Sequence, residues 1–202
     1  MSEQKRKLKI AIACQGGGSQ TAFTAGVLRA LCDAKIANDF EVVSISGTSG
    51  GAVCASLIWY AFRKGERPVW PRLMAFWEDN TARSAFESWF NDGVVNFTRA
   101  VNAGMLPILQ LSPASPMVQS MMQFMMAGQR ETFGSFRHLL QAHIDFDEIA
   151  AWGPGPDRPV LVLGACNVLT GKLEKFVSNK LAIQVEHILV RRAEHLSCRR
   201  NR

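Results

Sequence analysis

The sequence predicts an α/β fold with three layers, in which a mostly parallel sheet carries helices on both faces. Two observations support this prediction. Apolar segments of strand length alternate with amphipathic segments of helical spacing along the first half of the chain, which is the order that produces a parallel sheet. The chain also has 202 residues, of which 48% are apolar, and this is enough for one well-buried domain.

The first half of the chain predicts the order strand, helix, strand, helix. Residues 8–14 run apolar as a buried strand does, and residues 41–46 repeat that character. Residues 20–35 show helical spacing, and residues 50–62 predict a second helix that is apolar nearly all round. We expect the two strands to be parallel and buried on both faces. The apolar face of the first helix consists of Phe23, Val27, Leu28 and Leu31.

Residues 66–131 predict a mostly helical insertion after the second helix, because they contain tryptophans and prolines and no clear strand pattern. Five methionines in this insertion fall roughly on one side of a helix: Met117, Met121, Met122, Met125 and Met126. Packed core is the first interpretation of these methionines. Because methionine adapts to varied apolar partners, a flexible wall for an acyl chain is the alternative.

The rest of the chain returns to the alternating pattern. Residues 132–145 predict a helix, on which we expect His138 and His143 to be surface or packing residues. Residues 160–168 give the strongest strand signal in the chain, and a turn then leads into the segment 173–177. The apolar side of the predicted helix consists of Phe133, Phe136, Leu139 and Leu140.

The net charge of +6 is unevenly distributed. The last twelve residues, 191–202, contain five Arg and one Glu and so supply +4 of it. The body of the chain is therefore nearly neutral, which excludes a nucleic-acid-binding surface. The basic end is either a solvated tail or an arm attracted to phosphate or to a membrane.

Targeting signals and metal motifs are not evident in the sequence. No run of 18 or more apolar residues occurs, and the charged start lacks the apolar core of a secretory signal. These features predict a cytoplasmic protein. The five cysteines include no C-x-x-C pair, as expected for reduced thiols. We predict no disulfide, no metal and no cofactor.

A serine lies in the second of two glycine-rich turns, in the pattern G-T-S-G-G. With a predicted strand before it and a predicted helix after it, G-x-S-x-G describes a sharp bend that exposes the serine hydroxyl at the end of the sheet. Ser49 is therefore the predicted nucleophile of an acyl transfer. The backbone N–H of Gly50 begins the helix, where it can donate to an oxyanion. The other residues of this predicted elbow are Gly47, Thr48 and Gly51.

The first turn, Q-G-G-G-S-Q-T, has two interpretations. A phosphate or dinucleotide loop is the weaker one, because Thr21 replaces the third glycine of the fingerprint and the lysine of a P-loop is missing. In the other interpretation, the N–H groups of Gly16, Gly17 and Gly18 donate to a developing oxyanion. If the two strands are neighbours, both turns form one site.

The segments Q-G-G-G-S-Q-T-A-F-T-A-G-V-L-R-A-L and G-T-S-G-G-A-V-C-A resemble the opening of a patatin-like phospholipase domain, and the likeness covers about residues 8–190. The resemblance implies a lipid acyl hydrolase with a Ser–Asp dyad, a glycine-rich oxyanion loop, and lipid or phospholipid esters as substrates. On this chain it assigns the nucleophile to Ser49 and the oxyanion loop to the three glycines of the first turn. The family usually has Arg or Lys and then Gly where this chain has Gln20 and Thr21, which reduces the charge of the loop.

The resemblance also implies a catalytic Asp in a D-G-G or D-G-A turn, which is not found in this chain. The only Asp-Gly pair is Asp92–Gly93, inside the insertion, and we do not accept it as the dyad partner. Beyond residue 190 the Arg-rich segment 191–202 is expected to be foreign to the domain, through truncation or a shifted reading frame. We therefore expect lipid esterase activity near background. If enzymatic rates are found instead, the bases to reconsider are Asp92, Asp145 and His143.

Three functions follow from these observations. The first is a serine-dependent lipid acyl hydrolase, impaired by the absence of the dyad Asp, for which peripheral contact with membranes stays open. The second is a non-catalytic chain that binds lipid or a protein partner. The third, and weakest, is a nucleotide-binding module that uses the glycine loop. The lipid head group and chain length are not predicted.

Overall fold

A computed structural model of the chain describes residues 7–105, 116, 120, 135–156, 158–167 and 171–189. The chain forms two compact units. One contains the sheet, with the chain up to Phe76 and from Leu140 onwards, and the other runs from Trp77 to Leu139.

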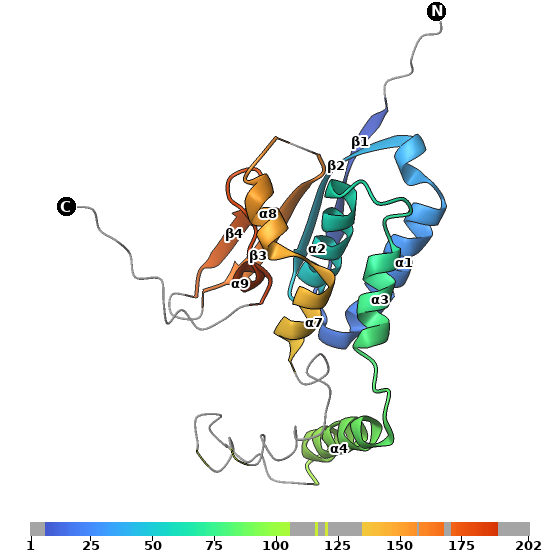
Figure 1. Ribbon diagram of the computed structural model, residues 1–202. Helices are drawn as coiled ribbons and strands as arrows, with labels where there is room; N and C mark the ends of the chain where they lie inside the picture. The colour runs from blue at the N-terminus through green and yellow to red at the C-terminus, as the bar shows by residue number, and fades with distance from the viewer. Residues whose placement is uncertain are drawn as a thin grey trace, which may run out of the picture. The chain divides into compact units, whose positions relative to one another are not determined.

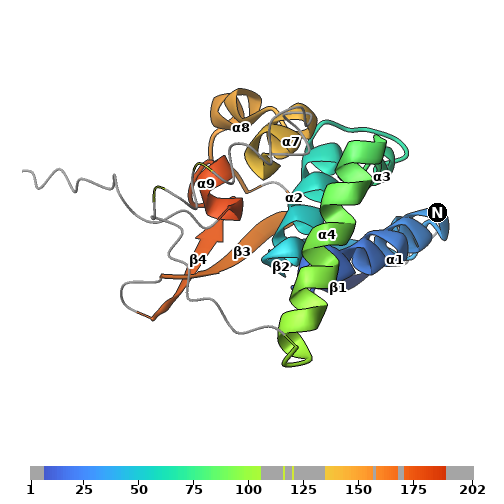
Figure 2. The ribbon, with the colours of Figure 1, turned by 90° about the horizontal axis from the view of Figure 1, so that it is seen from below.

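A four-stranded sheet forms the centre of the first unit (Figure 1). Its strands follow the order β1 (Leu8–Cys14), β2 (Phe40–Thr48), β3 (Val160–Cys166) and β4 (Leu173–Val177). The first three strands are parallel, and β4 runs antiparallel to β3, beside which Figure 2 shows it. The predicted α/β class with a mostly parallel sheet and surrounding helices is confirmed.

Burial of the strands differs between the centre and the edge of the sheet. In β2, every residue from Phe40 to Gly47 is buried or half-buried. Within the described part of the chain, strand β1 pairs with β2 alone, and its Ala11 and Ala13 are exposed. The expectation of burial on both faces is therefore wrong for β1, because an edge strand lies where the covering layers end.

Helix α1 (Thr21–Asp33) corrects one sequence-based expectation. Phe23 and Val27 were expected on its buried face, but these side chains are 79% and 42% exposed. The residues that α1 buries are Thr21, Ala25 and Leu28. The reason is close approach: the Cys54 thiol of α2 lies 3.5 Å from the Thr21 carbonyl oxygen, and a bulky side chain would not fit between the two helices.

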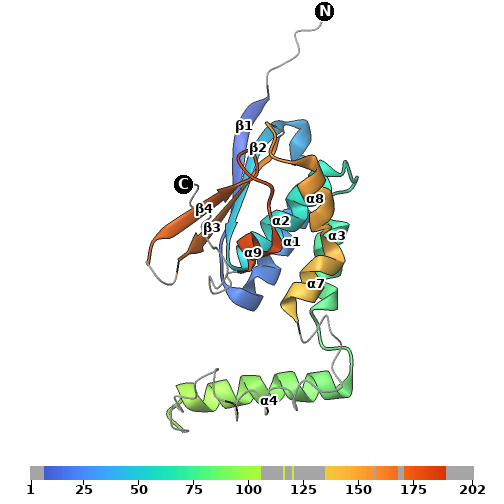
Figure 3. The ribbon, with the colours of Figure 1, turned by 60° about the vertical axis from the view of Figure 1, so that its left-hand side comes forward.

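Helix α2 (Gly50–Arg63) provides most of the core. All of its residues from Gly51 to Ala61 are buried, which confirms the prediction of a helix that is apolar nearly all round. Figure 3 shows α2 alongside the sheet. At its far end the Tyr60 hydroxyl donates a hydrogen bond to Glu148 of α8 (Phe146–Trp152). This contact ties the helix that follows Ser49 to the second half of the chain.

The region of the predicted helical insertion contains α3 (Pro71–Asp79) and α4 (Ala85–Asn102), joined by a short connection. Ser84 caps α4: its hydroxyl accepts from the Glu87 N–H, while the Glu87 carboxylate accepts from the Ser84 N–H, as in a capping box. The five methionines of the insertion lie outside the described residues. The limits of the insertion and of the domain stay predictions.

Two further helices lie later in the chain, and the residues of the first of them are divided between the two units. Helix α7 (Phe136–His143) begins later than predicted within the described residues, and α9 (Val185–Ile188) follows β4. His143 is a packing residue, as expected: its ring lies edge-on to Phe76 with 5.7 Å between centroids, and its carbonyl accepts from Arg72. Within the described ranges, no helix combines the length and apolar character needed to cross a bilayer.

Candidate active site

Ser49 lies at the bend between β2 and α2, and its backbone has an unusual conformation. Its φ of 56° and ψ of −130° are rarely adopted by residues other than glycine. Among the described non-glycine residues, Lys35 is the other one with positive φ. Such a conformation costs on the order of 1–3 kcal/mol and persists only where the surroundings enforce it. The exposed Ser49 side chain therefore projects from a bend that the fold holds under strain.

The bend is enforced by close backbone contacts at two glycines, Gly47 and Gly51. A Cβ atom on Gly47 would lie 2.2 Å from the carbonyl oxygen of Gly51. A Cβ atom on Gly51 would lie 2.3 Å from the carbonyl oxygen of Cys14, at the end of β1. Both distances are far below a normal contact, so the turn from strand to helix requires glycine at these two positions.

The glycine-rich loop after β1 lies directly beside Ser49. Strands β1 and β2 are paired so that Cys14 is opposite Gly47, and the two turns therefore leave the same edge of the sheet. A Cβ atom on Gly16 would lie 3.3 Å from the Cβ atom of Ser49. The structure thus brings together the two turns that the sequence assigns to one site.

Backbone N–H groups without an acceptor in the helix lie at the start of α2. The Ser49 carbonyl accepts from Ala52 and Val53, at 2.9 and 3.3 Å. The N–H groups of Gly50 and Gly51 belong to the first turn of α2, where the helix itself offers no acceptor. The N-terminus of a 14-residue helix also carries a partial positive charge. This end of α2 can therefore stabilise negative charge close to the Ser49 hydroxyl.

Thr21 shapes the glycine loop, a role that sequence reasoning missed. Its buried hydroxyl donates to the Gly18 carbonyl at 2.6 Å, and Gly18 itself has a φ of 56°. A Cβ atom added to Gly50 would lie 2.4 Å from the Thr21 hydroxyl oxygen, so this hydroxyl also requires glycine at position 50. A threonine at the start of a helix directly after a glycine run is the signal that could have indicated this role.

The two segments that form the site carry no charged side chain. None occurs between Lys9 and Arg29, and none between Glu41 and Arg63. Below the loop, burial and the nearby Cys54 thiol raise the pKa of the Cys14 thiol to about 11. Cys14 is therefore a neutral thiol at physiological pH and belongs to the core.

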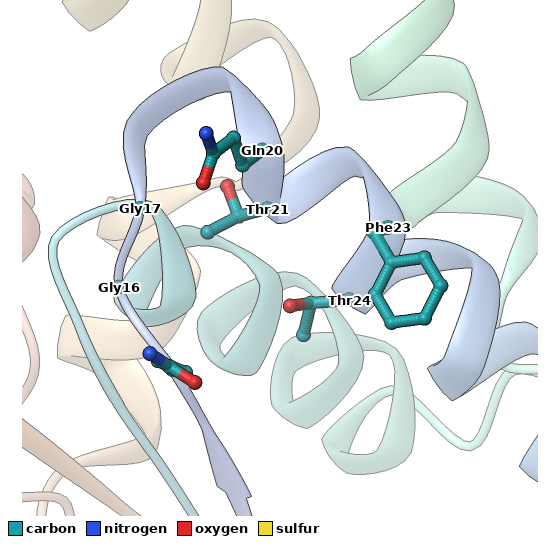
Figure 4. Close-up of a pocket in the computed structure, with 7 residues that line it drawn as sticks. Gly16, Gly17, Gln20, Thr21, Phe23 and Thr24 are labelled. Carbon is teal, nitrogen blue, oxygen red and sulfur yellow. The ribbon is translucent and has the colours of Figure 1, made fainter.

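A pocket of about 320 Å³ opens on the glycine loop (Figure 4). It extends from the loop to the first turn of α1, where Figure 4 shows Phe23 and Thr24. Because Gly16 both lines the pocket and lies beside Ser49, the two features share one loop. The lining residues are Gln15, Gly16, Gly17, Gln20, Thr21, Phe23 and Thr24.

The structure gives other roles to the three residues that were kept in reserve as bases. Asp92 and Gly93 lie inside helix α4 and do not form a turn. Asp145 caps α8 by accepting from the N–H groups of Asp147 and Glu148. His143 packs on Phe76, as described above. Among the described residues, no side chain forms a hydrogen bond with the Ser49 hydroxyl.

Nowhere in the part of the chain that the structure describes do three or more His, Cys, Asp or Glu side chains gather as a metal site requires. The geometry of the site is thus that of a strained serine, two glycine turns and a helix N-terminus.

Comparison with known proteins agrees with this geometry. A family model described as patatin-like phospholipase matches residues 12–151, which include the end of β1, both glycine turns, α1, β2 and α2. No curated protein and no solved structure matched the chain. Because the matched residues make up more than half of the sequence, the chain belongs to the patatin-like phospholipase family, whose members are lipid acyl hydrolases.

Proposed function

We propose that this chain acts on lipid esters as a serine-dependent acyl hydrolase, with Ser49 as the nucleophile. The observation that carries the proposal is the strained backbone of Ser49, with φ 56°, at a bend that close contacts of Gly47 and Gly51 enforce. Strain of this kind is found where a fold holds a reactive side chain in place. In this position the side chain is exposed at the carboxyl end of β2, where an ester can reach it.

The reaction proceeds in two steps, acylation of Ser49 and hydrolysis of the acyl-enzyme. Ser49 Oγ attacks the ester carbonyl carbon and loses its proton to a base, and the carbonyl oxygen becomes an oxyanion. The oxyanion collapses, the alcohol leaves with a proton, and an acyl-enzyme remains on Ser49. Water then releases the fatty acid by the same chemistry. The backbone N–H groups proposed to stabilise both oxyanions are those of Gly16, Gly17, Gly18 and Gly50.

The rate that we expect from this chain depends on whether a general base assists Ser49. A general base contributes roughly 10²–10⁴-fold, and none is hydrogen-bonded to Ser49 among the described residues. The only Asp-Gly pair of the sequence, Asp92–Gly93, lies within a helix. We therefore expect slow turnover of lipid esters. A reactive phosphonate, which needs less assistance than an ester, is expected to form a covalent bond with Ser49.

A fluorophosphonate with a long alkyl chain and a fluorescent reporter tests the proposal. The wild-type chain is expected to become labelled, and Ser49→Ala is expected to lose the label. Ser19→Ala is the matched control, because Ser19 is a second exposed serine on the glycine loop. Equal labelling of wild type and Ser49→Ala, with both chains folded by circular dichroism, would show that Ser49 is not the nucleophile.

A non-catalytic lipid-binding protein is the second candidate function. It is favoured by the missing hydrogen-bond partner of the Ser49 hydroxyl within the described residues. The same labelling experiment separates the two candidates. A lipid-binding protein would bind short-chain lipid esters but leave Ser49 unlabelled by the fluorophosphonate, whereas the hydrolase becomes labelled at Ser49.

Peripheral contact with membranes is proposed for helix α4, considered by itself. Three aromatic side chains of this helix are exposed: Phe86 at 42%, Trp89 at 68% and Phe97 at 52%. They fall within one sector of the helix, and the charged Asp92 and Arg99 fall outside it. Aromatic residues on one side of a helix favour the boundary between lipid and water. Trp89→Ala is expected to lower co-sedimentation with neutral phosphatidylcholine vesicles, whereas Ser88→Ala, on the polar side, is not.

A further inference from the structure

The pocket on the glycine loop differs from an acyl-chain site in the nature of its lining. Four of its side chains are polar but uncharged, and only Phe23 is large and apolar. A fatty acyl chain needs a mostly apolar wall. The pocket is therefore suited to the other half of a lipid ester, the alcohol part. The four polar side chains are those of Gln15, Gln20, Thr21 and Thr24.

The pocket also lacks a cationic side chain that could pair with an anionic group. No Lys or Arg lines it, and the nearest charged residue along α1, Arg29, is 3.6 Å from Asp33 and stacks on Trp70. The N–H groups at the start of α1 are engaged as well. The Gln20 N–H donates to the Gly17 carbonyl, and the Thr21 N–H donates within the same short turn. A phosphate placed here would lose its water without gaining a counter-charge.

The side chains that remain can bind hydroxyl groups. A glutamine amide both donates and accepts, as does a hydroxyl, so each complements an alcohol. The Gln20 side chain lies over the loop, with its carbonyl oxygen 3.8 Å from the position of a Cβ atom on Gly17. Phe23, 79% exposed, offers an aromatic face to the carbon skeleton of a polyol. These groups surround the loop that lies beside Ser49.

We propose that this pocket binds the uncharged, hydroxyl-bearing alcohol part of a lipid ester, such as glycerol, and that Gln20 makes the chain prefer neutral acylglycerols to phosphate-bearing lipids. The inference rests on the proposed function, because it assigns the alcohol part of the substrate of the same site. It adds a residue that determines specificity and a substrate class that the family assignment leaves open.

Two ligands that differ only in a phosphate test this inference. The full chain with Ser49→Ala, which cannot turn them over, is titrated with 1-butyrylglycerol and with its 3-phosphate. The readout is the side-chain amide signals of Gln15 and Gln20 in the ¹H–¹⁵N NMR spectrum. We expect both signals to shift with 1-butyrylglycerol, and the 3-phosphate to bind roughly tenfold more weakly.

Variants at Gln20 sharpen the test. In the same background, Gln20→Ala is expected to weaken binding of 1-butyrylglycerol by roughly two- to tenfold, the effect of one neutral hydrogen bond. Gln20→Arg is expected to reverse the preference in favour of the 3-phosphate. Ser19→Ala, which does not line the pocket, is the control and should bind both ligands as the parent does.

The outcomes distinguish this inference from the proposed function. Equal or tighter binding of the 3-phosphate to the parent chain, or no shift of either glutamine amide, overturns the inference even if Ser49 is labelled by a fluorophosphonate. Selective shifts without any labelling of Ser49 support the pocket and refute the hydrolase.

Discussion

Replacing Gly51 by alanine tests whether the turn after β2 packs as tightly as the structure indicates. The new Cβ atom would lie 2.3 Å from the carbonyl oxygen of Cys14 and 2.6 Å from that of Gln15. Distances under 3.0 Å are essentially never found for real Cβ atoms. Both oxygens belong to the backbone of the segment that leaves β1, so no side chain can rotate to relieve the clash.

The size of the effect follows from two opposing terms. Overpacking a tight interior costs typically about 1–3 kcal/mol, and we expect the upper end because backbone must move. Alanine gains about 1 kcal/mol over glycine in a helix interior, but the first turn of α2 gives only part of that. The expected loss is therefore about 2–3 kcal/mol. For a chain of this length, about 1 kcal/mol corresponds to roughly 2–4 °C in melting temperature.

Thermal unfolding followed by circular dichroism measures the effect, with Gly26→Ala as the control. Gly26 lies in α1 and is exposed, and a Cβ atom added there would meet no atom within 4 Å other than the nearby backbone of its own helix. Gly26→Ala is expected to raise the melting temperature slightly, through helix propensity alone. If Gly51→Ala behaves like Gly26→Ala, α2 does not approach β1 as described, and the argument for the enforced bend at Ser49 fails.

Three further predictions concern other residues. A Cβ atom on Gly17 has no neighbour closer than 3.7 Å, so Gly17→Val should fold normally yet slow fluorophosphonate labelling by about 10²–10³-fold if it blocks one oxyanion donor; unchanged labelling contradicts that role. Because burial raises the pKa of Cys14 to about 11 while Cys166 is exposed, iodoacetamide at pH 8 should modify Cys166 before Cys14, and modification of Cys14 as fast as that of Cys166 would refute its burial. The stability that the neutral Cys14 thiol provides should be lost as pH rises from about 9 to 11. Burial lowers the pKa of His187, whose Nδ1 accepts from the Gln184 N–H at 3.0 Å. The stability that neutral His187 provides should therefore be present above the usual pKa of histidine and lost as pH falls below it. If a His187→Phe chain loses the same stability in urea unfolding between about pH 7.5 and 5.5, this reasoning is contradicted.

Elements whose local sequence agrees with their final environment could be predicted from sequence. The segment 50–62 is apolar all round, and α2 is buried from Gly51 to Ala61. The strand signal at 160–168 corresponds to β3, between two other strands. The elbow could be anticipated because the steric need at its first glycine is local to the chain: a Cβ atom on Gly47 would meet the Gly51 carbonyl oxygen. The need at Gly51 comes instead from the backbone after β1.

Features that depend on contacts between distant segments could not be predicted in this way. The periodicity of α1 placed Phe23 and Val27 inward, but the helix turns Thr21 and Ala25 toward α2, because only small side chains fit where Gly50 approaches. The exposed alanines of β1 reflect its place at the edge of the sheet, which hydrophobicity alone does not reveal. The identity of the nucleophile, the oxyanion donors and the cytoplasmic location stay predictions.

Peptide mapping of the fluorophosphonate adduct by mass spectrometry tests the central claim most directly. The described residues contain other serines at exposed or half-buried positions, including Ser19 on the loop and Ser46 on β2. If the strained bend makes Ser49 the nucleophile, the adduct mass is expected on the peptide that contains Ser49, at close to one adduct per chain. An adduct spread over several serines, or found on Ser19 or Ser46 with Ser49 unmodified, would contradict the account.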